Sequence, residues 1–340
     1  MTTQQVGNAA APARLPLSGD FQALTDPYRR ELLVHSYRFL GSLDDAEDAL
    51  QESLLRAWRR LDTLKEQASL RPWLYRIVTN VSLDMLASRK ARSMPDLSRP
   101  PADPQAPLPS AVAEPVWVEP LPDEYLAGLE VSPEARYELH ESVSLAFLAL
   151  LQRLPGRQRA VLILRDVLGW KAQEVADLLD TSVAAVNSAL QRARETMKGL
   201  EGGSVSANHS SDSKTAELLS GYVQAWEAGD VRRLVSLLRH DAILTMPPLP
   251  AWYQGAEAIS QFFQQFLFAG AAEGRYRTAL TRANGSPAVV IYQADEGGHF
   301  RPASLQVLRL AGGQVARVDC FLISDDRLIA RFGLSATPAP

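Results

Sequence analysis

Near the middle of the chain, the stretch 184–194 (AAVNSALQRAR) carries side chains that can read the edges of DNA bases. Asn187 and Gln191 can each make two hydrogen bonds to an adenine. Arg192 can do the same to a guanine, or it can hold a phosphate. Alanines at 184 and 185 let a backbone approach a groove closely. The same composition also suits an ordinary solvent-facing helix, so the surrounding elements must decide between the two.

Those elements predict a helix-turn-helix. The stretch WKAQEVADLL precedes a short DTS turn, after which apolar residues recur at spacings of three and four, as on one buried helix face. Ser182 is a plausible N-cap for the second helix. In this geometry the second helix enters the major groove with its N-terminus first. On the pattern alone, a helical hairpin with a solvated polar face is an equal alternative. The apolar seam consists of Val183, Val186, Leu190, Ala193 and Met197.

Composition limits the class of protein. With 340 residues, 46% of them hydrophobic, the chain is long enough for two or three domains. Its single cysteine, Cys320, excludes an internal disulfide framework. Five scattered histidines have no metal-ligand spacing, so no metal or cofactor is expected. Because neither a signal peptide nor an apolar run of about 20 residues is evident, we expect a cytoplasmic protein without a membrane partner.

Charge and proline content divide the chain. The net charge is −4, but residues 93–144 alone hold ten Asp/Glu against two Lys/Arg, which leaves the flanking parts mildly basic and compatible with DNA. Residues 93–132 are rich in proline and acid, which favours an extended linker over a packed core. Residues 201–214 are Gly, Ser and Asn-rich and predict a second, flexible linker. We expect residues 1–20 to be disordered.

The remaining segments are periodic. Residues 21–92 and 133–200 show helical patterns throughout. Two apolar stripes at helical spacing in the first of these segments are Ala46, Leu50, Leu54, Ala57 and Leu61, and Leu74, Ile77, Val78, Val81 and Met85. Residues 215–332 begin with helices at 216–228, 231–239 and 255–268 and then give four strand-like runs separated by NGSP, DEGG and AGG turns. Helices followed by antiparallel strands predict an α+β domain, and the linker composition predicts that it is independent of the helical part.

A family resemblance favours the DNA-binding reading. The run LPGRQRAVLILRDVLGWKAQEVADLLDTSVAAVNSALQRAR resembles region 4 of extracytoplasmic-function sigma factors, and DAEDALQESLLRAWRRLDTLKEQASLRPWLYRIVTNVSLDMLASRKAR resembles their region 2. The resemblance implies a multidomain fold with two all-α sigma domains, a region 2 bundle and a region 4 helix-turn-helix, joined by the proline-rich linker. Asp180 stands where the family often has glycine; aspartate tolerates the left-handed conformation of that turn.

The resemblance also implies site residues, partners and function. The chain would bind core RNA polymerase through its β′ clamp helices and β flap and direct it to promoter DNA. Expected −35 contacts are Arg165, Ser182, Ala184, Ala185, Asn187, Ser188, Gln191, Arg192 and Arg194. Expected −10 contacts are Leu64, Lys65, Ala68, Ser69, Trp73, Arg76, Asn80, Arg89 and Lys90; for Trp73, core packing is an equal alternative. Expected polymerase contacts are Asp45, Asp48, Gln51, Glu52, Arg56 and Trp58.

The linker has a physical place in that scheme. In the family, this connector threads the polymerase channel that later carries RNA. Because that channel is built for a polyanion, an acidic extended peptide suits it. A solubilising spacer is the alternative, which the sequence leaves open.

The C-terminal segment resembles the SnoaL-like branch of the NTF2-like cone fold, through the run YVQAWEAGDVRRLVSLLRHDAILTMPPLPAWYQGAEAISQFFQQF and the strands after it. That fold encloses an apolar pocket, here with Trp252, Tyr253, Tyr292 and Asp319 as candidates for contacts to a small apolar ligand. Since no second acid or base accompanies Asp319, no catalytic residue is assigned, and modulation of the sigma factor is favoured over enzyme activity. The alternative is an NTF2-like enzyme or ligand sensor fused to a DNA-binding helix-turn-helix regulator.

Overall fold

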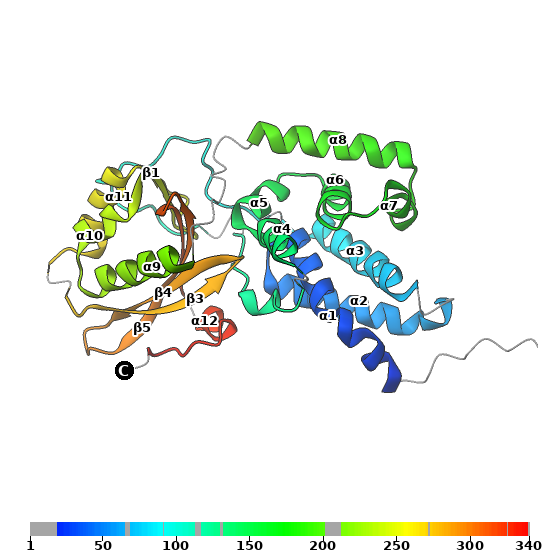
Figure 1. Ribbon diagram of the computed structural model, residues 1–340, viewed down its shortest axis with the longest axis horizontal. Helices are drawn as coiled ribbons and strands as arrows, with labels where there is room; N and C mark the ends of the chain where they lie inside the picture. Colours follow the sequence, from blue (N-terminus) through cyan, green and yellow to red (C-terminus); the bar gives the residue numbers. More distant parts are fainter. Residues whose placement is uncertain are drawn as a thin grey trace, which may run out of the picture.

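The computed structural model describes residues 19–64, 69–90, 92–112, 117–129, 132–200, 212–270, 273–324 and 326–338. Two helical domains and a C-terminal α+β domain lie side by side, as Figure 1 shows. We call residues 19–90 the first helical domain, 132–200 the second helical domain, 212–338 the C-terminal domain and 93–132 the linker. This architecture confirms the predicted fold class.

The first helical domain is a bundle of α1 (Gly19–Leu40), α2 (Leu43–Arg59) and α3 (Leu70–Ser88), with a 3-10 turn at Leu61–Thr63. Ser42 caps α2 by accepting a hydrogen bond from the Asp45 N–H at 3.2 Å. Pro72 lies in the first turn of α3, where its missing N–H costs no helical bond. The predicted stripes of α2 and α3 are the faces that the bundle buries.

The second helical domain consists of α4 (Pro133–Val143), α5 (Leu145–Leu151), α6 (Gly156–Leu162), a π turn at Ile163–Val167, α7 (Ala172–Leu178) and α8 (Val183–Leu200). It packs directly on the first helical domain. The rings of Tyr75 and Trp170 are 5.3 Å apart. The buried Arg159 of α6 donates to the carbonyl of Phe39 in α1 and to Gln152 Oε1 at 2.9 Å.

The C-terminal domain has helices α9 (Asp212–Glu227), α10 (Val231–Ser236), α11 (Ala256–Phe262) and α12 (Arg327–Arg331), with a π turn at Phe263–Leu267. Its sheet contains β1 (Leu238–Thr245), β2 (Trp252–Gln254), β3 (Tyr276–Ala283), β4 (Ser286–Ala294), β5 (Phe300–Ala311) and β6 (Gln314–Leu322), in the order β2-β1-β6-β5-β4-β3. The β1–β6 pair is parallel and the other pairs are antiparallel.

Successive residues of each strand alternate between two faces of this sheet. The inner face carries Tyr253, Leu308 and Val289 and packs on α9 to α11. The outer face carries Val290 and Val307, which belong to one continuous core with both helical domains. The expected independence of the C-terminal domain is therefore wrong: it shares a hydrophobic core with the part to which it is tethered.

Two further expectations need correction. The helix predicted at 231–239 ends at Ser236, and Leu238 begins a strand that the sequence pattern did not reveal. The linker is not a solvated extended chain, because Val118, Leu121 and Leu126 are buried in the shared core. The linker leaves the first helical domain at Ser93, runs along the C-terminal domain, and returns at Trp117, which pairs with Ser93.

Candidate nucleic-acid and polymerase interfaces

The helix-turn-helix presents an open polar face. Asp180, in the turn between α7 and α8, has φ of +49°, the left-handed conformation expected from the sequence. Ser182 accepts a hydrogen bond from the Ala185 N–H at 3.1 Å, so it is the cap of α8. Beyond the buried seam of Val186 and Leu190, the remaining face of α8 is exposed. Its predicted −35 residues are Ala184, Ala185, Asn187, Ser188, Gln191 and Arg192.

Three interactions set the borders of this face. Arg194 forms a two-bond pair with Asp166 at 2.7 and 2.8 Å, and this hydrogen bonding raises the pKa of the Arg194 guanidinium. Gln191 donates to Glu195 at 3.0 Å. Arg165, a predicted −35 contact, donates to the carbonyl of Trp170. Of the predicted arginines on α8, Arg192 therefore extends from the exposed face, whereas Arg194 is held against the π turn.

On the predicted −10 surface, two arginines are engaged in ion pairs. Arg76 of α3 pairs with Asp180 of the helix-turn-helix at 2.6 Å. Arg89 pairs with Asp45 and, at 3.5 Å, with Asp48, so predicted DNA contacts are joined to predicted polymerase contacts. Asn80 is exposed. Two of the predicted −10 cations, Arg76 and Arg89, are thus paired with acids of the same chain.

The other predicted −10 residues differ in solvent exposure. Leu64 is buried, whereas Ser69 and Lys90 are exposed. Trp73 is half-buried and packs against the shared core, which agrees with the core alternative for this residue. Lys65 and Ala68 lie outside the described residues.

The outward face of α2 is the predicted polymerase contact. Asp48, Gln51 and Trp58 are exposed, and Glu52 pairs with Arg56 at 2.7 Å. Sequence reasoning missed Leu55, whose side chain is 50% exposed beside Trp58, itself 53% exposed. Leu55 lies outside the buried Leu50/Leu54 stripe, so the helical spacing in the sequence was sufficient to predict that its side chain is exposed. Two adjacent exposed apolar side chains on a charged helix indicate a protein-binding surface.

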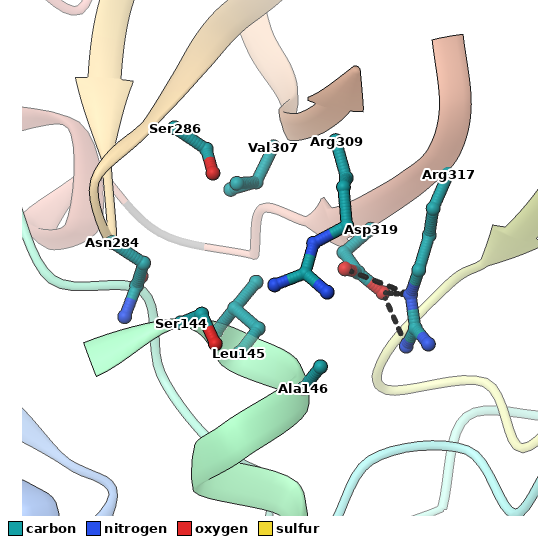
Figure 2. Close-up of a pocket in the computed structure, with 9 residues that line it drawn as sticks. All are labelled: Ser144, Leu145, Ala146, Asn284, Ser286, Val307, Arg309, Arg317 and Asp319. Atoms are coloured by element: carbon teal, nitrogen blue, oxygen red, sulfur yellow. Dashed lines mark hydrogen bonds and ion pairs between the residues drawn. The ribbon is translucent and has the colours of Figure 1, made fainter. Parts of the chain in front are cut away.

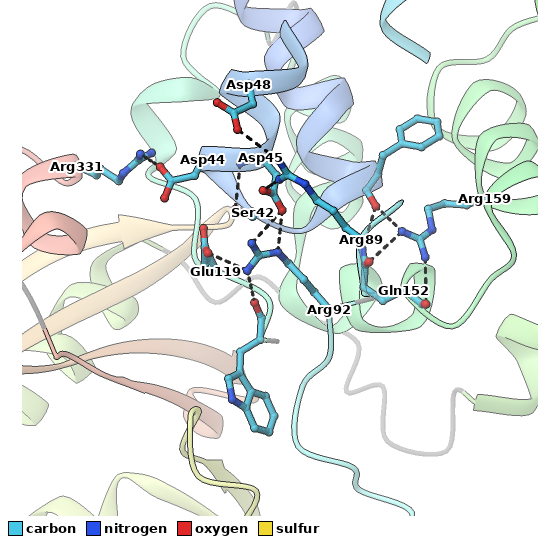
Figure 3. A network of polar contacts seen from close by, with 12 residues as sticks. Ser42, Asp44, Asp45, Asp48, Arg89, Arg92, Glu119, Gln152, Arg159 and Arg331 are labelled. Atoms are coloured by element: carbon cyan, nitrogen blue, oxygen red, sulfur yellow. Dashed lines mark hydrogen bonds and ion pairs between the residues drawn. The ribbon is translucent and has the colours of Figure 1, made fainter. Parts of the chain in front are cut away.

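A polar network joins this helix to the linker (Figure 3). Asp45 lies between Arg89 and Arg92. Arg92 also pairs with Glu119 of the linker at 2.8 Å and donates to the carbonyl of Trp117 at 2.9 Å. At the start of the same helix, Arg331 of α12 pairs with Asp44 and Glu47. The C-terminal domain and the linker therefore both contact α2 near its predicted polymerase face.

The four predicted pocket residues do not share a pocket. Strand register puts Trp252 and Asp319 on the outer face with Thr245, and Tyr292 on the same face, whereas Tyr253 lies on the inner face. Asp319 accepts a hydrogen bond from Thr245 at 2.7 Å and pairs with Arg317 at 2.8 Å. Tyr292 donates to the carbonyl of Ser335 at 2.9 Å. The expectation that they line one site is wrong, because adjacent strand residues point to opposite faces.

Asp319 instead borders a small cavity between the outer face and the start of α5, shown in Figure 2. Its volume is about 10 Å³, room for about one water molecule. Ser144, Leu145 and Ala146 form one side, and strands β5 and β6 form the other. This cavity is part of the packing between domains and is too small for an organic ligand.

Among the residues that the structure describes, no group of His, Cys, Asp and Glu side chains is placed to hold a metal ion. No helix in that part of the chain has the length and hydropathy to cross a membrane.

Comparison with known proteins agrees with the order of the domains. Family models for sigma-70 region 2, sigma-70 region 4 and a SnoaL-like domain match residues 24–92, 144–197 and 219–318. The ECF RNA polymerase sigma factor SigG of Mycobacterium tuberculosis H37Rv is 46% identical over 318 residues, which are 93% of this chain and 84% of SigG. SigJ of the same strain is 30% identical over 230 residues, which are 66% of this chain and 63% of SigJ.

A solved structure shows the same overall fold. The crystal structure of the M. tuberculosis extracytoplasmic-function sigma factor SigJ aligns with a TM-score of 0.57 and 24% identity, covering 93% of this chain and 99% of SigJ. The similarity to SigG over 93% of this chain and the three matching models establish that the chain belongs to the extracytoplasmic-function sigma factors of the sigma-70 family and carries a fused SnoaL-like domain.

Proposed function

We propose that residues 21–92 act as sigma region 2, residues 133–200 as region 4 and residues 215–332 as a domain that modulates both. As a sigma factor, the chain binds core RNA polymerase and directs it to promoters. In this proposal α8 reads the −35 element in the major groove. The start of α3 and the loop before it open the −10 element. The cytoplasm, where polymerase works, is its proposed location.

The open face of α8 is the observation that carries this assignment. Asn187, Gln191 and Arg192 are exposed on a capped helix whose opposite seam is buried, within a helix-turn-helix. Side chains of these types have the donors and acceptors that distinguish bases in the major groove. A purely structural surface helix would not need small residues at the N-terminal end of that same face.

Substitution of this face tests the assignment. Asn187→Ala and Arg192→Ala should each weaken binding to a cognate promoter by about 1–3 kcal/mol, with the loss confined to one position of the −35 element. The measurement is transcription and DNA binding by the full chain with core polymerase, on promoters mutated one base at a time. Arg232→Ala removes the same charge from the exposed surface of α10 and is the control.

The outcomes separate the possible roles of these residues. An equal loss on every sequence would make the substituted residue a phosphate contact, because phosphates carry no sequence information. Full activity for both variants would refute the recognition helix.

For the polymerase, we propose that the outward face of α2 binds the β′ clamp helices. Leu55 and Trp58 supply the apolar part, and Asp48 and Glu52 supply the charged rim. Region 4 would contact the β flap. Buried apolar anchors surrounded by charged residues are the usual arrangement of such interfaces.

We further propose that the arrangement described here is a closed form, in which the C-terminal domain holds the linker and the two helical domains together. Its support is the hydrophobic core that the C-terminal domain shares with both helical domains, in which linker residues expected in the RNA channel are buried. Within the helical part, Arg76 and Arg89 are paired with acids of the same chain. DNA and polymerase must replace these contacts, so opening must precede or accompany initiation.

The alternative, an NTF2-like enzyme or sensor attached to a DNA-binding regulator, is not favoured, because the chain also matches region 2 and SigG. An apolar ligand remains a separate proposal. Of the four candidates, Tyr253 faces the domain interior, where it stacks on Phe262 at 4.6 Å between ring centroids. A ligand there would change promoter activity only by binding the open and closed forms with different affinities.

A further inference from the structure

The turn between β3 and β4 inserts into the helical part of the molecule. Asn284 is only 1% exposed, although residues at the tips of β-hairpins usually lie in solvent. Its Nδ2 donates to Tyr37 Oη at 2.8 Å and to the carbonyl of Val143 at 2.7 Å. Its Oδ1 accepts a hydrogen bond from the Leu121 N–H at 2.9 Å. One turn side chain therefore binds α1, the end of α4 and the linker.

Gly285, the next residue of the turn, packs closely against α4. Gly285 has φ of +74°, and a Cβ there would lie 2.5 Å from the Cβ of His140 in α4. Its N–H donates to Asp123 of the linker at 2.8 Å, and Arg282 pairs with the same carboxylate at 2.9 Å. An Asn-Gly pair forms a tight hairpin turn in many proteins, but such a turn requires no burial. The burial here reflects a contact with the sigma domains.

The turn also binds the linker through hydrogen bonds between the backbones of the two segments. The Asn284 N–H donates to the Leu121 carbonyl at 2.9 Å, and Pro122 pairs with Ala283 as a short antiparallel extension of the hairpin. Both backbone polar groups of Leu121 are thus bonded to one residue of the C-terminal domain. If this segment moves into the polymerase channel, these bonds must break.

We propose that the Asn284–Gly285 turn is a lock on the linker, and that core polymerase opens the closed form by withdrawing the linker from this turn. The inference rests on the proposed function, since it takes the channel of the polymerase as the competing site. The linker is then the segment that the C-terminal domain and the polymerase exchange, and the two cannot hold it together.

Other contacts between the domains are weaker candidates for the lock. Arg331 reaches Asp44 across a surface where the aspartate is 66% exposed, and solvent and salt screen such pairs. The bonds of Asn284 are buried, so breaking them without replacement leaves the Leu121 N–H and the Val143 carbonyl unsatisfied. The burial of Tyr37 raises the pKa of its hydroxyl, which stays protonated and bonded to the Glu119 carbonyl at 2.6 Å.

Hydrogen exchange on the unmodified full chain tests the lock directly. The amides of Leu121 and Asn284 should be protected in the free protein. Addition of core RNA polymerase should speed exchange at the Asn284 amide at least about tenfold, because its acceptor on the linker leaves. An Asn284 amide that stays protected in the polymerase complex would overturn the proposal.

Two variants and a matched control test the same idea. Asn284→Gly removes the side-chain bonds and keeps a residue that accepts φ of +54°. Gly285→Ala adds a methyl group that collides with His140. Gly313→Ala, in the β5–β6 turn, creates similar backbone strain at φ of +79° with nothing within 4 Å of the new methyl group.

In the free chain, Asn284→Gly and Gly285→Ala should speed exchange at Leu121 at least about tenfold and tighten binding to core polymerase by a similar factor. Gly313→Ala should change neither. Unchanged hydrogen exchange at Leu121 in folded Asn284→Gly would overturn the lock. Faster hydrogen exchange at Leu121 with unchanged affinity for core polymerase would overturn the proposal that the linker passes from the turn to the polymerase. If the wild-type chain does not bind core polymerase, the proposed function fails, while exchange in the free chain still decides whether the turn holds the linker.

Discussion

The two surfaces that we propose to contact DNA differ in whether their charged side chains are already paired. On α8 the polar face is exposed, and Arg192 extends from it. On α3 and its C-terminal flank, Arg76 and Arg89 are paired with Asp180 and Asp45 of the same chain. In our proposal, the surface for duplex recognition is therefore accessible, whereas cations of the surface for strand opening are already paired within the chain.

The ion pairs that distinguish the two surfaces have small interaction free energies. Exposed ion pairs contribute about 0–1 kcal/mol each, so the arginines of α3 are held by weak bonds that a polyanion can replace. In the proposed closed form, the shared hydrophobic core and the buried hydrogen bonds of Asn284 hold the domains together.

Reversing charges on α2 should give the largest effect and tests whether the closed surface overlaps the polymerase contact. Asp48→Lys with Glu52→Lys should weaken core polymerase binding by about tenfold to a hundredfold, or about 1.4–2.8 kcal/mol. The measurement is core affinity by titration, with circular dichroism to confirm folding. Glu217→Lys with Glu296→Lys makes the same change of net charge on the exposed surface of the C-terminal domain. Equal affinity of both double variants would place the polymerase contact elsewhere.

The pH dependence of the unfolding free energy tests the contribution of a buried side chain, His35. Burial, with help from the charge of Arg38, lowers the pKa of His35 to about 3, while its Nε2 is 2.9 Å from Thr79 Oγ1. Below pH 6.5 the unfolded chain takes up this proton and the folded chain does not. The unfolding free energy should therefore fall by about 1 kcal/mol between pH 7 and 5.5 from this group alone.

Urea unfolding at the two pH values measures this loss. His35→Gln should flatten the profile in that window. His240→Gln removes an exposed histidine of β1 and is the control. An unchanged slope in His35→Gln would refute the attribution to His35.

The smallest effect is expected at the contact between the two DNA surfaces. Asp180→Asn keeps a side chain that tolerates the left-handed turn and removes the partner of Arg76. Binding to single-stranded −10 DNA should improve by less than about fivefold, and the gain should shrink as salt rises. Asp177→Asn, on the exposed surface of α7, is the control. A gain above tenfold would show that this single pair, rather than the buried contacts, keeps α3 closed.

Local pattern predicted much of the helical part. The seams of α2, α3 and α8, the cap at Ser182 and the left-handed Asp180 follow from residues within a few positions of one another, and the structure has them. The exposed positions of α8 follow from the same periodicity. Which of them touch bases stays a prediction.

Long-range pairing was beyond the same reasoning. The helix predicted at 231–239 includes Leu238 and Arg239, which are the first two residues of β1, and this segment becomes a strand by pairing with β2 and β6. The four pocket candidates were chosen by residue type, and only strand register shows that Tyr253 faces away from the other three. The NGSP segment was correctly read as a turn, but nothing near it in sequence reveals the socket formed by Tyr37, Leu121 and Val143.

The sequence distance between the turn and its socket has a consequence for biosynthesis. Leu121 and Asn284 are 163 residues apart, and a ribosome adds roughly 5–20 residues per second. A nascent chain therefore exposes its linker for roughly 8–30 seconds before the turn that binds it has been made. The second sigma domain ends at residue 200, so for about the second half of that interval both sigma domains have been synthesised and the linker has no turn to hold it. Each new copy begins its existence unlocked, and it closes only when translation has passed the β3–β4 hairpin.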